Sequence, residues 1–174
     1  MRKFTAIFFV FVLVIAFSGC SFMSIERPVF SENILFSLNH GAPGFGTQAE
    51  CTDAEIVIHT NCSVKVMMVS ADYSEIIEVG SVVLSENDYE RLVSIADRDR
   101  IFGLRVKDGE ADDGSSYHIT LYDENDEKLV SKGGYMPVGD EFWEIYNSIK
   151  DILKPYGITE IVKHHRKILN EAWG

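Results

Sequence analysis

Fourteen consecutive residues near the start of the chain, 4–17, are almost entirely apolar. They follow a short cationic start that contains Arg2 and Lys3, and the small residues Ser18 and Gly19 close the segment. A membrane-spanning helix needs roughly twenty apolar residues, so this run is short for a span. A positive start, an apolar middle and a small-residue end are typical of an export signal rather than of a structural helix. The fold must therefore be sought in the residues that follow.

The export segment ends in Phe17-Ser18-Gly19-Cys20. This tetrapeptide resembles the lipobox of bacterial lipoprotein precursors, with Phe17 where that family usually has Leu. The resemblance implies that Cys20 becomes the new N-terminus and carries two or three acyl chains such as palmitate. It also implies an exported protein, anchored by lipid to the cell membrane or the outer membrane, with its domain outside the cytoplasm. The resemblance thus concerns where the protein is located and implies no biochemical activity.

The chain is thus predicted to have three parts. Residues 1–19 form the lipoprotein signal peptide, residues 20–32 form the lipidated cysteine with a short tether, and residues 33–174 form a single globular domain. Domains cluster at about 100–150 residues, so the last part is long enough for a real core. The ten residues 21–30 reach at most roughly 35 Å when extended, so the domain should lie close to the membrane.

The charge of the chain argues against nucleic acid as a partner. The net charge is -11, and it becomes -13 once Arg2 and Lys3 are removed with the signal peptide, which contains no acid. A domain this acidic repels phosphate backbones, and no basic stripe with interleaved aromatic residues offsets the repulsion.

Alternating apolar residues predict a set of short strands. Glycine and proline punctuate residues 40–47, which are predicted to be a loop. Asn61-Cys62 is predicted to be a two-residue hairpin turn, Gly80 suggests a bulge, and residues 133–137 are predicted to be a connector. The predicted strands are 34–38, 54–60, 63–69, 75–84, 102–106, 116–122 and 128–131.

Three helices are predicted from capping residues and apolar stripes. Ser85 is expected to cap the first helix, Asp140 the second, and the third begins at about Ile158. Residues 97–100 are interpreted as a solvated charge run that ends the first helix. The architecture that follows is α+β, an antiparallel sheet with two to three amphipathic helices packed on one face.

No motif in the chain predicts a cofactor or a catalytic centre. The five histidines lack the spacing of a helical zinc pair, and Gly-x-Ser-x-Gly is absent. His165 lies at the centre of the last apolar stripe and is interpreted as a hydrogen-bonded core residue. His59 and His118 are placed on the sheet face that points away from the predicted core, where they could meet.

The loop at residues 108–114 is the nearest approach to a metal site. Asp108, Glu110 and Asp112 alternate much as the ligands of a calcium loop do, and they are weak metal candidates. Asp113 stands where that motif has its turn glycine, and Ile119 stands where it needs a bidentate Glu. A solvated loop is therefore the favoured interpretation.

Four further residues leave alternatives open. An exported chain with Cys51 and Cys62 invites a disulfide, but a hairpin between strands 54–60 and 63–69 would hold the two thiols well over 15 Å apart, at about 3.3 Å per residue. Geometry therefore disfavours the bridge. Trp143 and Trp173 lie off the centre of their helical stripes, and packing against a second element is favoured over exposure to a partner.

Lys163, Arg166 and Lys167 gather on the predicted outer face of the last helix. They are either an ordinary helix exterior or a membrane-facing cluster that turns one side of the acidic domain towards anionic lipid or wall polymer. The function favoured overall is a non-catalytic binding or interaction module at the cell envelope, with an envelope protein or the cell wall as its partner. The alternatives are an envelope hydrolase with an unrecognised site, or a small metal-binding or solute-binding lipoprotein.

Overall fold

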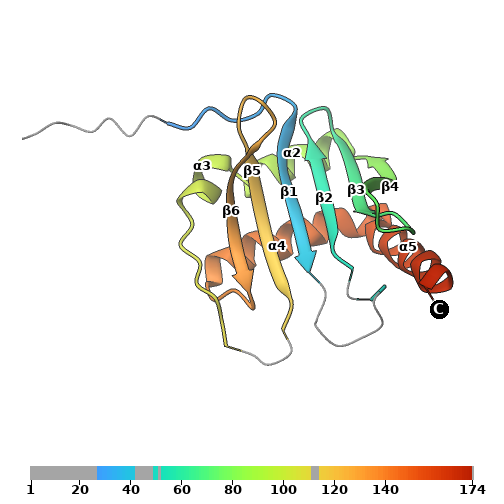
Figure 1. Ribbon diagram of the computed structural model, residues 1–174. Helices are drawn as coiled ribbons and strands as arrows, with labels where there is room; N and C mark the ends of the chain where they lie inside the picture. Colours follow the sequence, from blue (N-terminus) through green and yellow to red (C-terminus); the bar gives the residue numbers. More distant parts are fainter. Residues whose placement is uncertain (1–26, 42–48, 51, 111–113, 174) are drawn as a thin grey trace, which may run out of the picture.

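The structure is a computed structural model that describes residues 27–41, 49–50, 52–110 and 114–173. Strands form one antiparallel sheet, and helices cover one of its faces (Figure 1). The predicted α+β class is confirmed. The strands are β1 (Ile34–Gly41), β2 (Ala54–His59), β3 (Ser63–Val69), β4 (Ile76–Val83), β5 (Ser116–Tyr122) and β6 (Lys128–Tyr135). The helices are α2 (Glu86–Ile95), α3 (Arg98–Gly103), α4 (Asp140–Leu153), the 3-10 turn η1 (Lys154–Tyr156) and α5 (Ile158–Trp173).

Strand β1 lies inside the sheet, whose order is β4-β3-β2-β1-β5-β6. The first four strands form a meander, and the β5–β6 hairpin adds to the other side of β1. Leu38 of β1 is therefore flanked by Ile56 of β2 and Ile119 of β5. Side chains alternate between the two faces of a strand, so this register places the apolar side chains in rows on the helix-covered face.

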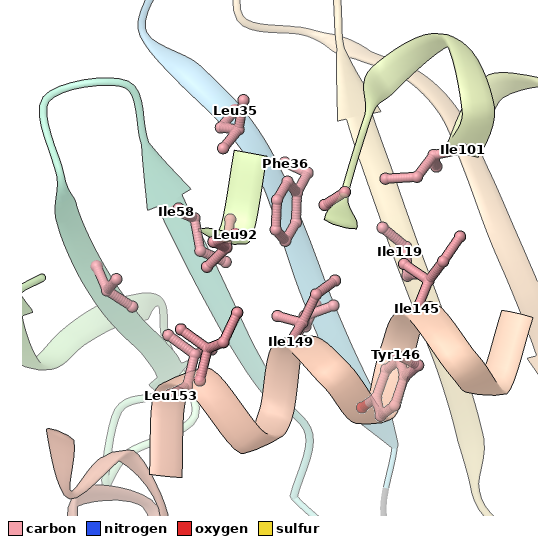
Figure 2. Close-up of a cluster of buried hydrophobic side chains, with 14 of the residues drawn as sticks. Leu35, Phe36, Ile58, Leu92, Ile101, Ile119, Ile145, Tyr146, Ile149 and Leu153 are labelled. Atoms are coloured by element: carbon pink, nitrogen blue, oxygen red, sulfur yellow. The ribbon is translucent and has the colours of Figure 1, made fainter. Parts of the chain in front are cut away.

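Helix α4 crosses the sheet behind the strands in the view of Figure 1, and it supplies much of the core, as Figure 2 shows from the helix side. Its apolar stripe points at Phe36 of β1, Ile58 of β2 and Ile119 of β5, all of them fully buried. Full burial of one such side chain contributes about 1.5–3 kcal/mol. The buried residues of α4 are Phe142, Ile145, Tyr146, Ile149, Ile152 and Leu153.

Several local predictions are confirmed. Ser85 caps α2, and its side chain accepts a hydrogen bond from the Asp88 N–H. The β2–β3 hairpin forms, but its turn has three residues, Thr60, Asn61 and Cys62, instead of the predicted two. Cys62 adopts the left-handed region at a φ of 66°. The β3–β4 register shifts beside Gly80, as the predicted bulge requires. A Cβ on Gly80 would lie 2.8 Å from Ile161 of α5, so the glycine also permits close packing of that helix.

The strand predicted at residues 102–106 is wrong, because the chain forms the short helix α3 there. The Asp97 side chain accepts a hydrogen bond from the Arg100 N–H, which starts a new helical turn. Ile101 is fully buried and holds that turn against the core. The charges at residues 97–100 therefore begin a second helix instead of only ending the first.

The connector predicted at residues 133–137 is also wrong, because β6 continues through Tyr135. Gly133 and Gly134 do not break the strand. A Cβ on Gly133 would lie 1.9 Å from the Tyr117 carbonyl oxygen, so the absence of a side chain lets β6 lie close to β5. The predicted cap of α4 is displaced by one residue, since Gly139 is the N-cap and Asp140 is the first helical residue.

The chain that leads into β1 is held at one end of the sheet. The Ser31 N–H donates to the Tyr122 carbonyl at 2.9 Å, and Arg98 donates to the Ser31 carbonyl at 2.7 Å. This end carries the β2–β3 and β5–β6 turns (Figure 1). Within the described ranges, none of the helices is both long and apolar enough to cross a membrane.

Candidate ligand-binding groove

The sheet face away from the helices carries a polar network across three strands. Glu55 Oε1 accepts hydrogen bonds from the Ser37 and Tyr122 hydroxyls, both at 2.8 Å. Burial raises the pKa of Tyr122 to about 12, so this hydroxyl stays protonated as a donor at neutral pH. The network joins β1, β2 and β5, and we interpret it as structural.

A shallow depression of about 330 Å³ lies beside this network. His118 lines it, whereas His59 is paired with Ile34, five residues along β1 from Asn39, the partner of His118. That offset separates the two histidines by about 16 Å along the strand, so they do not meet. The lining residues are Asn39, Asp53, Glu55, Ser116, His118, Thr120, Lys128 and Ser131.

On the other face, a groove runs between α4 and α5 over β1 and β2. Its inner part has a volume of about 240 Å³ and adjoins a second hollow of about 330 Å³. The two hollows share Ile56, Lys150, Ile158 and Thr159, so they form one continuous surface. We call it the α4–α5 groove. Its apolar lining comes from Leu38, Ala54, Ile56, Tyr146, Leu153, Ile158 and Val162.

The rim of the α4–α5 groove is positively charged. Lys150 and Lys154 stand on the α4 and η1 side, and Lys163 and Arg166 stand on the α5 side. Asp151 is the one carboxylate in the lining that the described residues provide. Four cations converge here on a chain whose net charge is -11, so the groove attracts anions where the rest of the domain repels them.

Arg166 is fixed at the inner end of this rim. Its Nη2 donates to the Thr52 carbonyl at 2.8 Å. Its Nε is buried and has no hydrogen-bond partner among the residues that the structure describes.

His40 lines the inner groove and adds no charge at neutral pH. Its ring stacks on Tyr117 with centroids 4.7 Å apart. Burial lowers the pKa of His40, and the positive charges of Lys150 and Arg166 lower it further, although Asp53 opposes them. The imidazole is therefore mainly neutral at pH 7, and the positive charge of the groove comes from lysine and arginine.

The structure describes two of the three weak metal candidates, Asp108 and Glu110. Asp108 Oδ1 accepts the Tyr135 N–H at 3.0 Å and thereby secures the end of β6. Glu110 is exposed, and Asp112 lies outside the described residues. In the described part of the chain, no three His, Cys, Asp or Glu side chains gather closely enough to hold a metal ion.

Two packing predictions are confirmed. His165 is buried, and its Nε2 lies 2.8 Å from the Val69 carbonyl oxygen. A carbonyl can only accept, so Nε2 carries the proton. Trp143 packs edge-on against Tyr117, and its Nε1 donates to the Pro137 carbonyl at 2.7 Å.

Trp173 and the cysteines complete the residues singled out in the sequence. Trp173 stacks on Tyr73 with centroids 3.8 Å apart, which agrees with packing against a second element. Cys62 is a free thiol at the β2–β3 turn, in keeping with the disfavoured disulfide. Cys51 and the lipidation candidate Cys20 lie outside the described residues.

The cations predicted on the outer face of α5 have different surroundings. Lys163 and Arg166 line the groove, whereas Lys167 is exposed and lies 3.8 Å from Glu171. The sequence interpretation missed Lys150 and Lys154, whose i, i+4 spacing on α4 and η1 was the available signal. Comparison of the chain with protein-family models, curated proteins and solved structures finds no match in any of the three.

Proposed function

We propose that this chain is an exported lipoprotein, anchored through lipid on Cys20, whose domain is a non-catalytic binding module with the α4–α5 groove as its ligand site. The anchor is supported by Phe17-Ser18-Gly19-Cys20 and the apolar segment before it. The observation that carries the binding role is the groove itself, an apolar floor enclosed by four cations.

The chemistry of the groove supports binding rather than turnover. Lysine and arginine at neutral pH are charged donors that attract and orient anions. Burial raises the pKa of Tyr146, so its hydroxyl stays neutral. The proposed anchor would confine this binding site to the envelope, because a short tether keeps the domain at the envelope surface. A wall polymer or an envelope protein is within reach there.

The anchor is tested by Cys20→Ala in the full chain. We expect the variant to lose detergent-phase partitioning, either by release to the medium or as an uncleaved precursor that lacks lipid. Cys62→Ala is the matched control, since it removes a thiol from the folded domain and should leave partitioning unchanged. Detergent-phase partitioning of Cys20→Ala equal to that of the natural chain would exclude the lipoprotein proposal.

A further inference from the structure

We propose that the α4–α5 groove binds an amphipathic anion, a single short alkyl chain that ends in a carboxylate or a phosphate. This inference rests on the proposed function and names the class of its ligand. The groove offers two kinds of surface in one place, apolar side chains on the floor and cations on the rim. A ligand must match both surfaces to leave neither one unsatisfied.

The floor selects an alkyl chain. Leu38 and Ile56 come from adjacent strands, and Ile158 and Val162 lie one turn apart on α5, so apolar surface continues from the sheet to the helix. A polar ligand would lose hydration over this surface without a hydrogen bond in return. The two hollows, about 240 and 330 Å³, lie near the lower end of the range for small-molecule sites, which favours one short chain over a two-chain lipid.

The rim selects an anionic head group. Arg166 is held by the Thr52 carbonyl, so its guanidinium is oriented before a ligand arrives. Lys150 and Lys163 flank the same inner hollow from opposite helices. Carboxylates and phosphates form strong charge-assisted hydrogen bonds with such groups. Asp151 lines only the outer hollow, so the anionic end is expected at the inner one.

The experiment uses the full lipidated protein in nanodiscs of a zwitterionic phospholipid, with empty nanodiscs as the blank. Four probes of equal chain length and two head-group probes are titrated by equilibrium dialysis. They are octanoate, octyl phosphate, octylamine, octanol, acetate and inorganic phosphate. We expect saturable binding of octanoate or octyl phosphate, and no saturable binding of the other four. The octanoate and octyl phosphate arms decide between a fatty carboxylate and a lipid phosphate.

Variants then locate the site. Lys150→Gln and Lys163→Gln each remove an exposed rim cation and should weaken binding by about tenfold or more, as expected for loss of a charge-assisted hydrogen bond. Lys167→Gln is the matched control, since it makes the same change on α5 beside Glu171 and should bind as the natural chain does. Arg166→Gln should also weaken binding, but it is interpreted only if its unfolding transition is unchanged.

Two results would overturn the inference. Octanol binding as tightly as octanoate would show that the rim contributes nothing. Equal losses in Lys163→Gln and Lys167→Gln would show that only overall charge matters. Either result leaves the anchored binding module standing if Cys20→Ala abolishes membrane attachment. Conversely, amphiphile binding together with an unlipidated Cys20 would retain the groove and remove the anchor.

Discussion

At the scale of single residues, Gly133 is tightly constrained by the backbone of the neighbouring strand. Its φ is 140°, and a Cβ would lie 1.9 Å from the Tyr117 carbonyl oxygen on the neighbouring strand. Gly133→Ala must therefore push β6 away from β5 or distort both strands. We expect the free energy of unfolding to fall by about 2–3 kcal/mol, measured by urea denaturation.

Gly103→Ala is the control for that substitution. Gly103 ends α3, and a Cβ there would meet no atom within 4 Å. We expect the free energy of unfolding of Gly103→Ala to be unchanged or raised by up to about 1 kcal/mol, because alanine favours a helix more than glycine does. Equal losses in the two variants would mean that the close approach of β6 to β5 is not what requires glycine.

Residues differ in how far their roles could be predicted from the sequence. His165 could be assigned to the core because helical periodicity alone places it at the centre of an apolar stripe. Arg166, its neighbour, could not be assigned to a groove because its partner, the Thr52 carbonyl, lies 114 positions away. Gly133 was misinterpreted for a similar reason, since the strand that requires its bare backbone becomes evident only once β5 and β6 are paired.

At the scale of elements, η1 holds the N-terminus of α2. The Tyr156 hydroxyl accepts from the Ser85 N–H at 2.9 Å and donates to Asp88 Oδ2 at 2.8 Å. The hydrogen bond from Tyr156, followed by that from Ser85, lowers the pKa of Asp88. A carboxyl whose pKa is lowered by folding stabilises the fold above its unfolded pKa, and this contribution is lost as the pH falls through the folded value.

Tyr156→Phe should therefore destabilise the domain, and more at pH 7 than at pH 3. Loss of the acceptor for the Ser85 N–H alone should lower the free energy of unfolding by about 1 kcal/mol. The measurement is urea denaturation of the natural chain and of the Tyr156→Phe variant at pH 7 and at pH 3. In an Asp88→Asn background, the effect of Tyr156→Phe should become almost independent of pH. If the difference in free energy of unfolding between the natural chain and Tyr156→Phe is the same at both pH values, Tyr156 does not lower the pKa of Asp88.

The elements themselves were predictable where local chemistry determines them. Ser85 with Asp88 is a capping pattern that needs no tertiary contact, and α2 begins where it predicts. Asp97 with Arg100 is a similar local pattern, but it follows directly on another helix and was interpreted as that helix's charged end. The far end of β6 depends on its pairing with β5, which no local pattern contains.

At the scale of the whole molecule, the sequence predicted the sheet with its helices and missed the groove. The groove joins side chains from β1, β2, α4 and α5, from Leu38 to Arg166. Periodicity identifies which face of each helix is apolar, but it does not determine how far apart two helices lie over a sheet. Lys163 and Arg166 were therefore interpreted as part of a helix exterior. The i, i+4 spacing of Lys150 and Lys154 places these two lysines on one side of their helix, but it does not show that they face α5.

The direction of the tether bears on how the domain stands at a membrane. The chain reaches β1 at the end of the sheet that holds the β2–β3 and β5–β6 turns (Figure 1). The cationic half of α5 lies at the other end, where His165 contacts Val69, the last residue of β3. From Ile34 to His40 the strand rises by about 20 Å. If the chain is anchored through Cys20 as proposed, the point where the tether enters the domain places the groove on the side away from the membrane.

The domain could be oriented by its tether, or by the α5 cations facing the membrane. These two orientations give opposite results for probes placed at the two ends of the sheet. Asn125 lies in the exposed β5–β6 turn, and His164 is exposed on α5 between the cations, so Asn125→Cys and His164→Cys leave Lys163, Arg166 and Lys167 intact. Each is labelled with a fluorophore in a Cys51→Ser and Cys62→Ser background and anchored in anionic vesicles. A spin-labelled lipid head group then serves as the quencher.

We expect stronger quenching at position 125 than at position 164, with little dependence on salt, because the tether and not charge sets the orientation. A tether of at most roughly 35 Å still permits the domain to turn over. If the three cations of α5 face the membrane instead, quenching will be stronger at position 164 at low salt. That excess will then vanish near physiological ionic strength or above, where the Debye length is about 8 Å or less. Such a result would place the α4–α5 groove against the lipid, so its amphipathic ligand would come from the membrane itself.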